Sequence, residues 1–243
     1  MISLPIVVNN EYFKWQLMLW WWNQKLVYGS KAVNKSRAIV ISKNFRSEAT
    51  RSHDWLKDIP HVYCDGASQD PIVGEDLRVL DLPLNIQYGV REAIKDLPDE
   101  QIIEILDGDM FHLRAHPKIV VRDDMLLVSD IYENWHLKSL TIHRPVIERY
   151  FENGGRFYNG GFVPIVGKVK TFRKIMYEWI AIHRDILKRD DIIETKPFRW
   201  WGGMFALQAA CEKAKVTMIA DDTCYIVLDL IKPSFPRSKT FNL

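Results

Sequence analysis

The sequence contains little cysteine. Only three cysteines occur among 243 residues, and none of their spacings matches a zinc site or a redox motif. An odd number of widely separated thiols excludes a disulfide scaffold. We therefore expect Cys64, Cys211 and Cys224 to be reduced and mostly buried, in a protein of a reducing compartment.

The sequence also lacks an excess of charge and a long hydrophobic run. With 33 basic and 31 acidic residues the formal net charge is +2, which gives no electrostatic footprint for a nucleic-acid partner. The apolar run 17–22 is far shorter than the roughly 20 residues of a membrane-spanning helix. The N-terminus has no charged region followed by a cleavage site. We expect a soluble, cytoplasmic protein without a membrane span.

Internal repeats, low-complexity segments and long linkers are absent, which favours a single domain over residues 1–243. Short apolar segments alternate with amphipathic ones, a pattern typical of a parallel α/β sheet. Strands are predicted at 6–8, 38–42, 61–63, 77–82, 102–106, 162–166 and 216–219, with two strands or a hairpin in 118–128. Helices are predicted at 11–28, 88–97, 171–187 and 203–214. In the first helix, one apolar stripe is expected to contain Tyr12, Trp15, Leu19, Trp22 and Leu26.

The most informative segment joins the apolar strand 102–106 to two carboxylates. Ligands bind an open α/β sheet beyond the carboxyl ends of its strands. Asp107 and Asp109 supply oxygen ligands that suit Mg²⁺ or Mn²⁺, and Gly108 allows backbone to approach a diphosphate. A surface turn is the alternative, because Asp and Gly are also turn residues. The apolar residues on both sides favour the metal site.

Two later segments combine a glycine pair with groups that suit a sugar. Asn159 precedes Gly160, Gly161 and an apolar strand, where its carboxamide can face a ligand or form a plain turn. Trp200, Trp201 and Gly202 precede the helix predicted from residue 203, whose N-terminal N–H groups attract anions. A helix packed through its tryptophans is the alternative.

With these three segments in this order, the chain resembles glycosyltransferases of the GT-A fold. Around Asp107 and Trp201 it is also similar to hydroxyproline arabinosyltransferases, although Gly203 stands where those enzymes have a Glu before the Met. The resemblance implies a GT-A (nucleotide-diphospho-sugar transferase) α/β fold with a mainly parallel mixed sheet flanked by helices. It implies a nucleotide-binding half over about 1–115 and an acceptor half over about 116–243.

The resemblance also implies the ligands of particular residues. Mn²⁺ or Mg²⁺ would be held by Asp109 and Asp107. The nucleotide-sugar donor, a UDP-sugar, would be bound by Val8, Asn9, Asn85, Gln87, Tyr88, Asp107, Gly108 and Asp109. The sugar and the acceptor would be bordered by Asn159, Gly160, Gly161, Trp200, Trp201 and Gly202.

An inverting transfer needs a base that deprotonates the acceptor hydroxyl. Asp190, Asp191 and Glu194 are candidates, and an exposed helix end is the alternative for them. We thus expect a metal-dependent glycosyltransferase acting on a hydroxyl of a glycan, a peptide or a small molecule. One rival is a nucleotidyltransferase, against which the chain lacks a glycine-rich phosphate loop followed by Lys or Arg. The other rival is a catalytically silent carbohydrate-binding protein. It stays an alternative because Gly203 stands where the arabinosyltransferases have a Glu.

Overall fold

The computed structural model describes residues 1–8, 11–30, 35–41, 56–64, 82–108, 110, 112, 115, 119–130, 148–151, 160–188 and 196–220. Within these residues the protein is an α/β fold with one seven-stranded sheet. The predicted α/β class and the mainly parallel, mixed character of the sheet are confirmed.

The sheet has the spatial order β3-β2-β1-β4-β6-β5-β7. Its strands are β1 (Ile2–Val8), β2 (Ala38–Ile41), β3 (His61–Cys64), β4 (Ile102–Asp107), β5 (Met125–Asp130), β6 (Gly160–Lys168) and β7 (Thr217–Ala220). β6 runs antiparallel to its neighbours β4 and β5, and the other pairs are parallel. The carboxyl ends of β1 and β4 therefore lie at the same edge.

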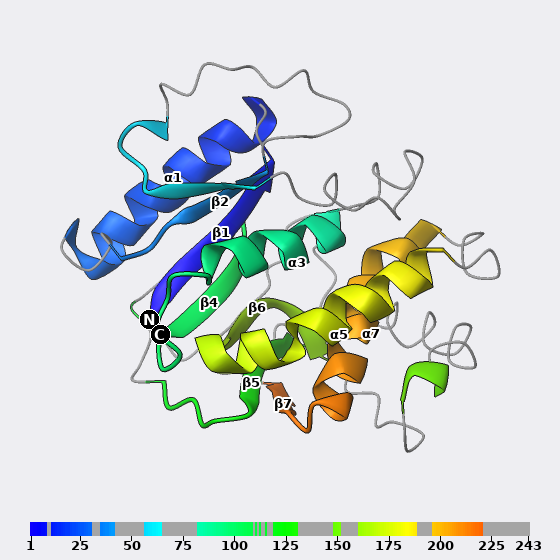
Figure 1. Cartoon of the computed structure of the whole chain (residues 1–243). Helices are drawn as coiled ribbons and strands as arrows, with labels where there is room; N and C mark the ends of the chain where they lie inside the picture. Colours follow the sequence, from blue (N-terminus) through cyan, green and yellow to red (C-terminus); the bar gives the residue numbers. More distant parts are fainter. Residues whose placement is uncertain are drawn as a thin grey trace, which may run out of the picture.

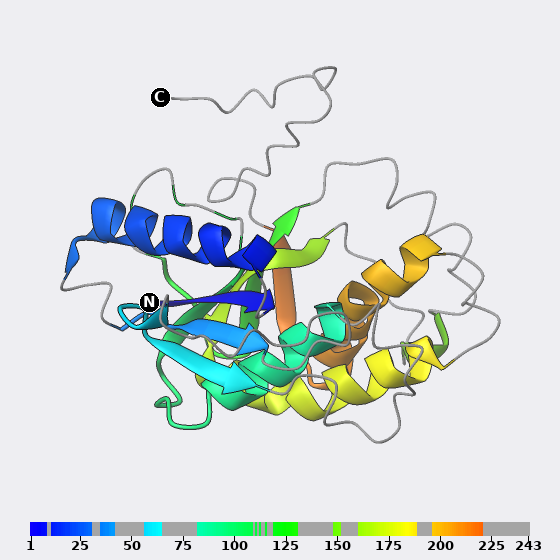
Figure 2. The ribbon, with the colours of Figure 1, turned by 90° about the horizontal axis from the view of Figure 1, so that it is seen from above.

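Helices cover both faces of the sheet. Figure 1 shows α1 (Glu11–Tyr28) on one side, and α3 (Leu82–Ala93), α5 (Val169–Leu187) and α7 (Lys196–Lys213) on the other. The view from above in Figure 2 separates the two helical layers, with the sheet between them. A 3-10 turn, η4 (Glu148–Tyr150), contacts α5 where the Tyr150 hydroxyl donates to Asp185 at 2.5 Å. Among the described residues, no helix combines the length and hydropathy that a bilayer crossing requires.

Side-chain alternation along the strands divides the core in two. In β4, Ile103 and Ile105 pack toward α3, α5 and α7, whereas Leu106 packs with Val7 toward α1. Burying each aliphatic side chain stabilises the fold by roughly 1.5–3 kcal/mol. A register slip of one residue would turn these side chains to the wrong face, so both cores fix the register of β4.

The predicted face of α1 is wrong. Leu17, Trp20 and Trp21 are the large apolar side chains of this helix that pack against β1 and β2. The members of the predicted stripe that the structure describes are exposed, namely Trp15, Leu19, Trp22 and Leu26. Residues 17–22 are all apolar, so their periodicity cannot select a face, and contact with the sheet makes the selection.

Two boundaries in the first half of the chain also differ from prediction. α3 begins at Leu82 and ends at Ala93, so residues 82–87 are helical where a strand end and a loop were expected. The segment 118–128 contributes a single strand, β5, and residues 119–124 form no strand. The predicted strand at 77–81 lies outside the described residues.

The start of α7 is the third difference. This helix begins at Lys196, seven residues before the predicted Gly203. Pro197 lies in the first turn, where a missing backbone N–H is tolerated. Gly202 and Gly203 are therefore inside the helix, and the prediction that they form an anion-binding helix start is wrong.

Candidate functional site

The site begins where β1 and β4 leave the sheet. The parallel register of these strands places Ile6 beside Asp107. Asp107 is the last residue of β4, and its side chain is partly exposed. Its carboxylate therefore belongs to the edge at which α/β sheets bind ligands.

Gly108 follows at a point of close backbone approach. A methyl group there would lie 2.5 Å from Cγ1 of Val7 and 3.5 Å from the carbonyl oxygen of Ile6. The N–H of Met110 donates to the carbonyl oxygen of Asp107 at 3.1 Å, so the chain turns directly after the strand. Gly108 is buried, so this is a packed turn and not the exposed surface turn of the alternative interpretation.

Helix α1 brings an unpaired polar atom to the same place. Oε1 of Gln16 lies 3.7 Å from the position that a methyl group at Gly108 would take. The side chain of Gln16 is 3% exposed, and this oxygen has no hydrogen-bond partner among the described residues. A buried acceptor without a donor is uncommon, and a water molecule or a ligand group can satisfy it. The amide oxygen of the core residue Gln87 is another such atom, so it is the position beside Gly108 that distinguishes Gln16.

A buried polar network anchors the chain just after this turn. His112 Nε2 donates to Glu104, with 3.1 Å to Oε1 and 3.0 Å to Oε2. The hydroxyl of Ser3 donates to Glu104 Oε2 at 2.7 Å, and Gln24 Nε2 donates to His112 Nδ1. Neutral His112 with its proton on Nε2 satisfies both of these contacts. A charged residue in the middle of an apolar strand is thus paired on the α1 face of the sheet.

The backbone of His112 is held as firmly as its ring. Nδ2 of Asn23 donates to the His112 carbonyl oxygen at 2.9 Å, and the His112 N–H donates to Asn23 Oδ1 at 3.0 Å. The ring of Tyr28 packs edge-on against the imidazole, with 5.4 Å between centroids. Side chains of α1 therefore fix the chain five residues beyond Asp107.

The metal prediction is not tested by these residues and stays a prediction. Asp109 lies outside the described residues, and within the described ranges no three His, Cys, Asp or Glu side chains gather as a metal site. Asp107, the close approach at Gly108 and the orphaned oxygen of Gln16 nevertheless fit a hydrated divalent cation. Carboxylate and carboxamide oxygens are hard ligands, and Mg²⁺ keeps several waters that need acceptors.

The residues predicted to bind the nucleotide-sugar donor lie in different parts of the structure. Val8 ends β1 at the site's edge, while Asn9 lies outside the described residues, as does the side chain of Asn85 in α3. Gln87 is fully buried and donates from Nε2 to His183 Nδ1 at 2.9 Å. It is a core residue here, and its role as a donor ligand stays a prediction.

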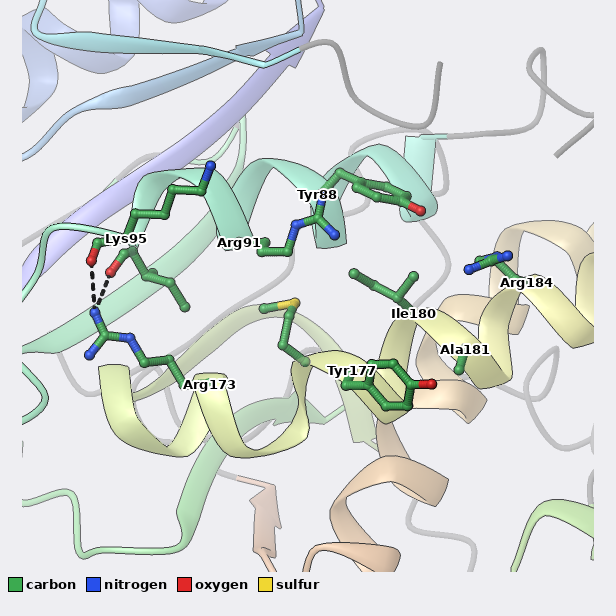
Figure 3. Close-up of a pocket in the computed structure, with 10 residues that line it drawn as sticks. Tyr88, Arg91, Lys95, Arg173, Tyr177, Ile180, Ala181 and Arg184 are labelled. Atoms are coloured by element: carbon green, nitrogen blue, oxygen red, sulfur yellow. Dashed lines mark hydrogen bonds between the residues drawn. The ribbon is translucent and has the colours of Figure 1, made fainter. Parts of the chain in front are cut away.

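Tyr88 borders a groove of about 570 Å³ between α3 and α5, on the face opposite α1 (Figure 3). The groove is lined by apolar side chains, among them Met176 and Ile180, and by four cationic side chains. Two of these cations are engaged within the protein: Arg173 donates to three carbonyl oxygens just beyond the end of α3 at 2.8–3.0 Å, and Lys95 pairs with Glu92. The groove thus joins two helices and is separate from the Asp107 edge.

His183 is a core histidine on the buried face of α5. It is fully buried, and burial lowers its pKa to about 3. Gly202 of α7 packs against it, since a methyl group at Gly202 would lie 3.4 Å from His183 Cδ2 and 3.1 Å from Ile186 Cγ2. Gly202 therefore has a packing role between α5 and α7.

The other acceptor-side predictions remain predictions. Gly160 and Gly161 begin β6, and Trp200 and Trp201 lie in α7, but the structure does not describe these tryptophan side chains. Asn159 and the proposed bases lie outside the described residues, namely Asp190, Asp191 and Glu194. Cys64 and Cys211 are buried thiols outside any disulfide, as predicted, and burial raises the pKa of the Cys211 thiol.

Sequence reasoning missed the polar residues that α1 contributes. Gln16, Asn23 and Gln24 gave no motif, and His112 was assigned no role. A usable signal was Glu104, the one charged residue within the apolar strand. A charge in a buried strand needs a partner, and that partner is His112.

No curated protein and no solved structure matches the chain. The family model for the hydroxyproline O-arabinosyltransferase N-terminal domain matches residues 5–220, a range that includes every described element except the first residues of β1. The chain therefore belongs to the hydroxyproline O-arabinosyltransferase family.

Proposed function

We propose that the protein is a metal-dependent glycosyltransferase of the GT-A fold that moves a sugar from a UDP-sugar to a hydroxyl acceptor. The observation that carries this proposal is the end of β4, where Asp107 and the buried Gly108 leave the sheet beside β1. Membership of the arabinosyltransferase family supports a transferase. It also makes a UDP-pentose and a peptidyl hydroxyproline the first substrates to test.

In the proposed site, Asp109 and Asp107 hold Mn²⁺ or Mg²⁺ against the diphosphate. When bound, the ion neutralises the negative charge that grows on the departing diphosphate. The chain keeps this site in place by closing backbone against backbone at Gly108. It also ties His112 to α1 and to Glu104, which limits the motion of the segment that bears the carboxylates.

The acceptor half supplies the remaining groups of the proposal. Asn159, Gly160 and Gly161 border the sugar, and Trp200 and Trp201 offer flat faces to the sugar or the acceptor. If the transfer inverts configuration, one of Asp190, Asp191 and Glu194 takes the proton of the acceptor hydroxyl. With α7 starting at Lys196, these acids precede the helix by two to six residues in sequence.

A thermal-shift panel tests the proposal. UDP, GDP, CDP and dTDP are each added with and without Mn²⁺, followed by UDP-arabinose with a hydroxyproline peptide and mass spectrometry of the product. We expect UDP with Mn²⁺ to raise the melting temperature most, because a ligand at 100 times its Kd stabilises by about 2.7 kcal/mol. Pentose transfer to the peptide should follow.

Two further measurements, with nucleoside triphosphates and with free sugars, separate the rival functions. A nucleotidyltransferase would release pyrophosphate from a nucleoside triphosphate, and a silent carbohydrate-binding protein would bind sugars without releasing UDP. If no nucleoside diphosphate shifts the melting temperature in the presence of Mn²⁺, the proposed donor chemistry is wrong.

A further inference from the structure

We propose that Gln16 is a binding residue of the donor site, and that its carboxamide oxygen accepts a hydrogen bond from an O–H group of the bound ligand. That group is either a hydroxyl of the nucleotide sugar or a water molecule on the metal ion. The inference rests on the proposed function, because it concerns the same end of β4.

The first support is the position of Gln16 on α1. Gln16 and Gln24 are both buried, and eight residues of α-helix separate them by about 12 Å along the axis. This spacing places them on one face of the helix, which runs from Gly108 at one end to His112 at the other. The row of residues 16, 20 and 24 thus has a buried amide at each end, with the core residue Trp20 between them.

The second support is the contrast between the two ends of that row. At the His112 end, Asn23 and Gln24 make three hydrogen bonds with the backbone and the ring of His112. At the Gly108 end, Oε1 of Gln16 is just as buried but receives no hydrogen bond. Helix α1 is therefore able to satisfy its buried amides, and the exception is the one beside Gly108.

The third support is the chemistry of the unpaired atom. A carboxamide oxygen is a neutral acceptor, so it pairs with an O–H or N–H donor and gains nothing from a phosphate oxygen. The indole nitrogens of Trp20 and Trp21 are also unpaired, but they are donors and cannot meet the same group. A ribose hydroxyl or a metal-bound water is the donor that the proposed ligands carry.

Calorimetry on the full-length chain tests the inference with Gln16→Met, which keeps the length of the side chain and removes the acceptor. UDP, Mn²⁺ and the two together are titrated into the parent, Gln16→Met and the control Gln101→Met. Gln101 precedes β4 at the opposite end of the strand from Asp107, and its Nε2 donates to the carbonyl oxygen of Ile102. Gln16→Leu repeats the measurement with a different side-chain shape.

We expect Gln16→Met to raise the Kd of UDP with Mn²⁺ about five- to tenfold, the scale of one lost hydrogen bond. The melting temperature without ligand should stay unchanged or rise, because an apolar side chain replaces an unpaired acceptor. If Gln16 had only a structural role, Gln16→Met would leave the Kd of UDP unchanged and lower the melting temperature. Gln101→Met should keep the parent's Kd.

The separate titrations also identify the group that donates the hydrogen bond to Gln16. A weaker affinity for Mn²⁺ alone indicates a metal-bound water, and a change confined to UDP indicates a hydroxyl of the nucleotide. If the parent binds UDP and both Gln16 variants bind it equally well, the inference is wrong and the proposed function stands. If the parent binds no nucleotide, the proposed function fails and the inference fails with it.

Discussion

His112 Nε2 lies 3.0 Å from a carboxylate oxygen of Glu104, and both side chains are buried between α1 and the sheet. Glu104 belongs to β4, three residues before Asp107, whereas His112 follows Asp107 by five residues. The contact therefore joins β4 to the chain beyond the turn at Gly108. Both side chains that make it are buried.

We predict that this pair is coupled energetically. His112→Leu should lower the free energy of unfolding by about 2–3 kcal/mol, because it removes a hydrogen bond from a buried carboxylate. Glu104→Leu alone should cost a similar amount. The double variant should cost less than the sum, since neither polar group is then left without its partner. Urea unfolding measures all three, with His61→Gln on β3 as the control, and an additive double variant would contradict the coupling.

Removing the proposed metal ligands should abolish metal-dependent donor binding. Asp109→Asn keeps the shape of the side chain and removes its charge, so we expect loss of transfer and of the Mn²⁺-dependent thermal shift. Asp107→Asn should weaken both to a lesser degree. Asp96→Asn, in the exposed turn before β4, should resemble the parent. Full activity of Asp109→Asn, or of the parent in EDTA, would end the metal-dependent hypothesis.

The close approach at Gly108 gives a prediction of compensation. Gly108→Ala should cost about 1–3 kcal/mol, because its methyl group would lie 2.5 Å from Cγ1 of Val7. Val7→Ala alone also destabilises, since it leaves a cavity beside β1. In the double variant the new methyl group occupies the space that Val7 vacates. Its loss of stability in urea unfolding should therefore be smaller than the sum of the two single losses, and a larger loss would show that the contact is not the cause.

His183 predicts a dependence of stability on pH. Burial lowers its pKa from 6.5 to about 3, so between these values the unfolded chain binds a proton that the folded protein refuses. The contribution of His183 to the free energy of unfolding is fully present above pH 6.5 and decreases as the pH falls toward 3. Between pH 6 and pH 5 we expect a loss of about 1 kcal/mol.

Urea unfolding of the parent and of His183→Gln at pH 7, 6 and 5 isolates this contribution. Glutamine preserves a polar partner for Gln87 and removes the titrating ring. The parent should lose more stability than the variant over this range. Parallel pH profiles of the two proteins would show that His183 is protonated equally well in the folded state.

Local patterns predicted much of the fold. The buried face of α5 follows from its periodicity, and its members Phe172, Ile175 and Trp179 are all buried. The end of β4 at Asp107 follows from an apolar run that stops in carboxylates. These features depend on neighbours within a few residues, whose spacing the chain itself sets.

Other features depend on contacts between distant residues. Nothing local places β6 antiparallel between β4 and β5, or brings Gln16 to Gly108, 92 positions away in the sequence. The start of α7 at Lys196 was missed because two glycines inside a helix oppose its formation, by about 1 kcal/mol each relative to alanine. Tight packing of Gly202 against α5 explains why this helix tolerates one of them.

The sequence by itself determined the alternation of strands and helices, the carboxylates that end β4 and the burial of one face of α5. The tertiary structure decided which side of the uniformly apolar segment of α1 meets the sheet, and with it the position of Gln16, Asn23 and Gln24 beside the chain that leaves β4. The reason is physical: periodicity encodes the burial of a face only where polar residues mark the other face. Where they do not, the packing of the helix against its sheet makes the choice.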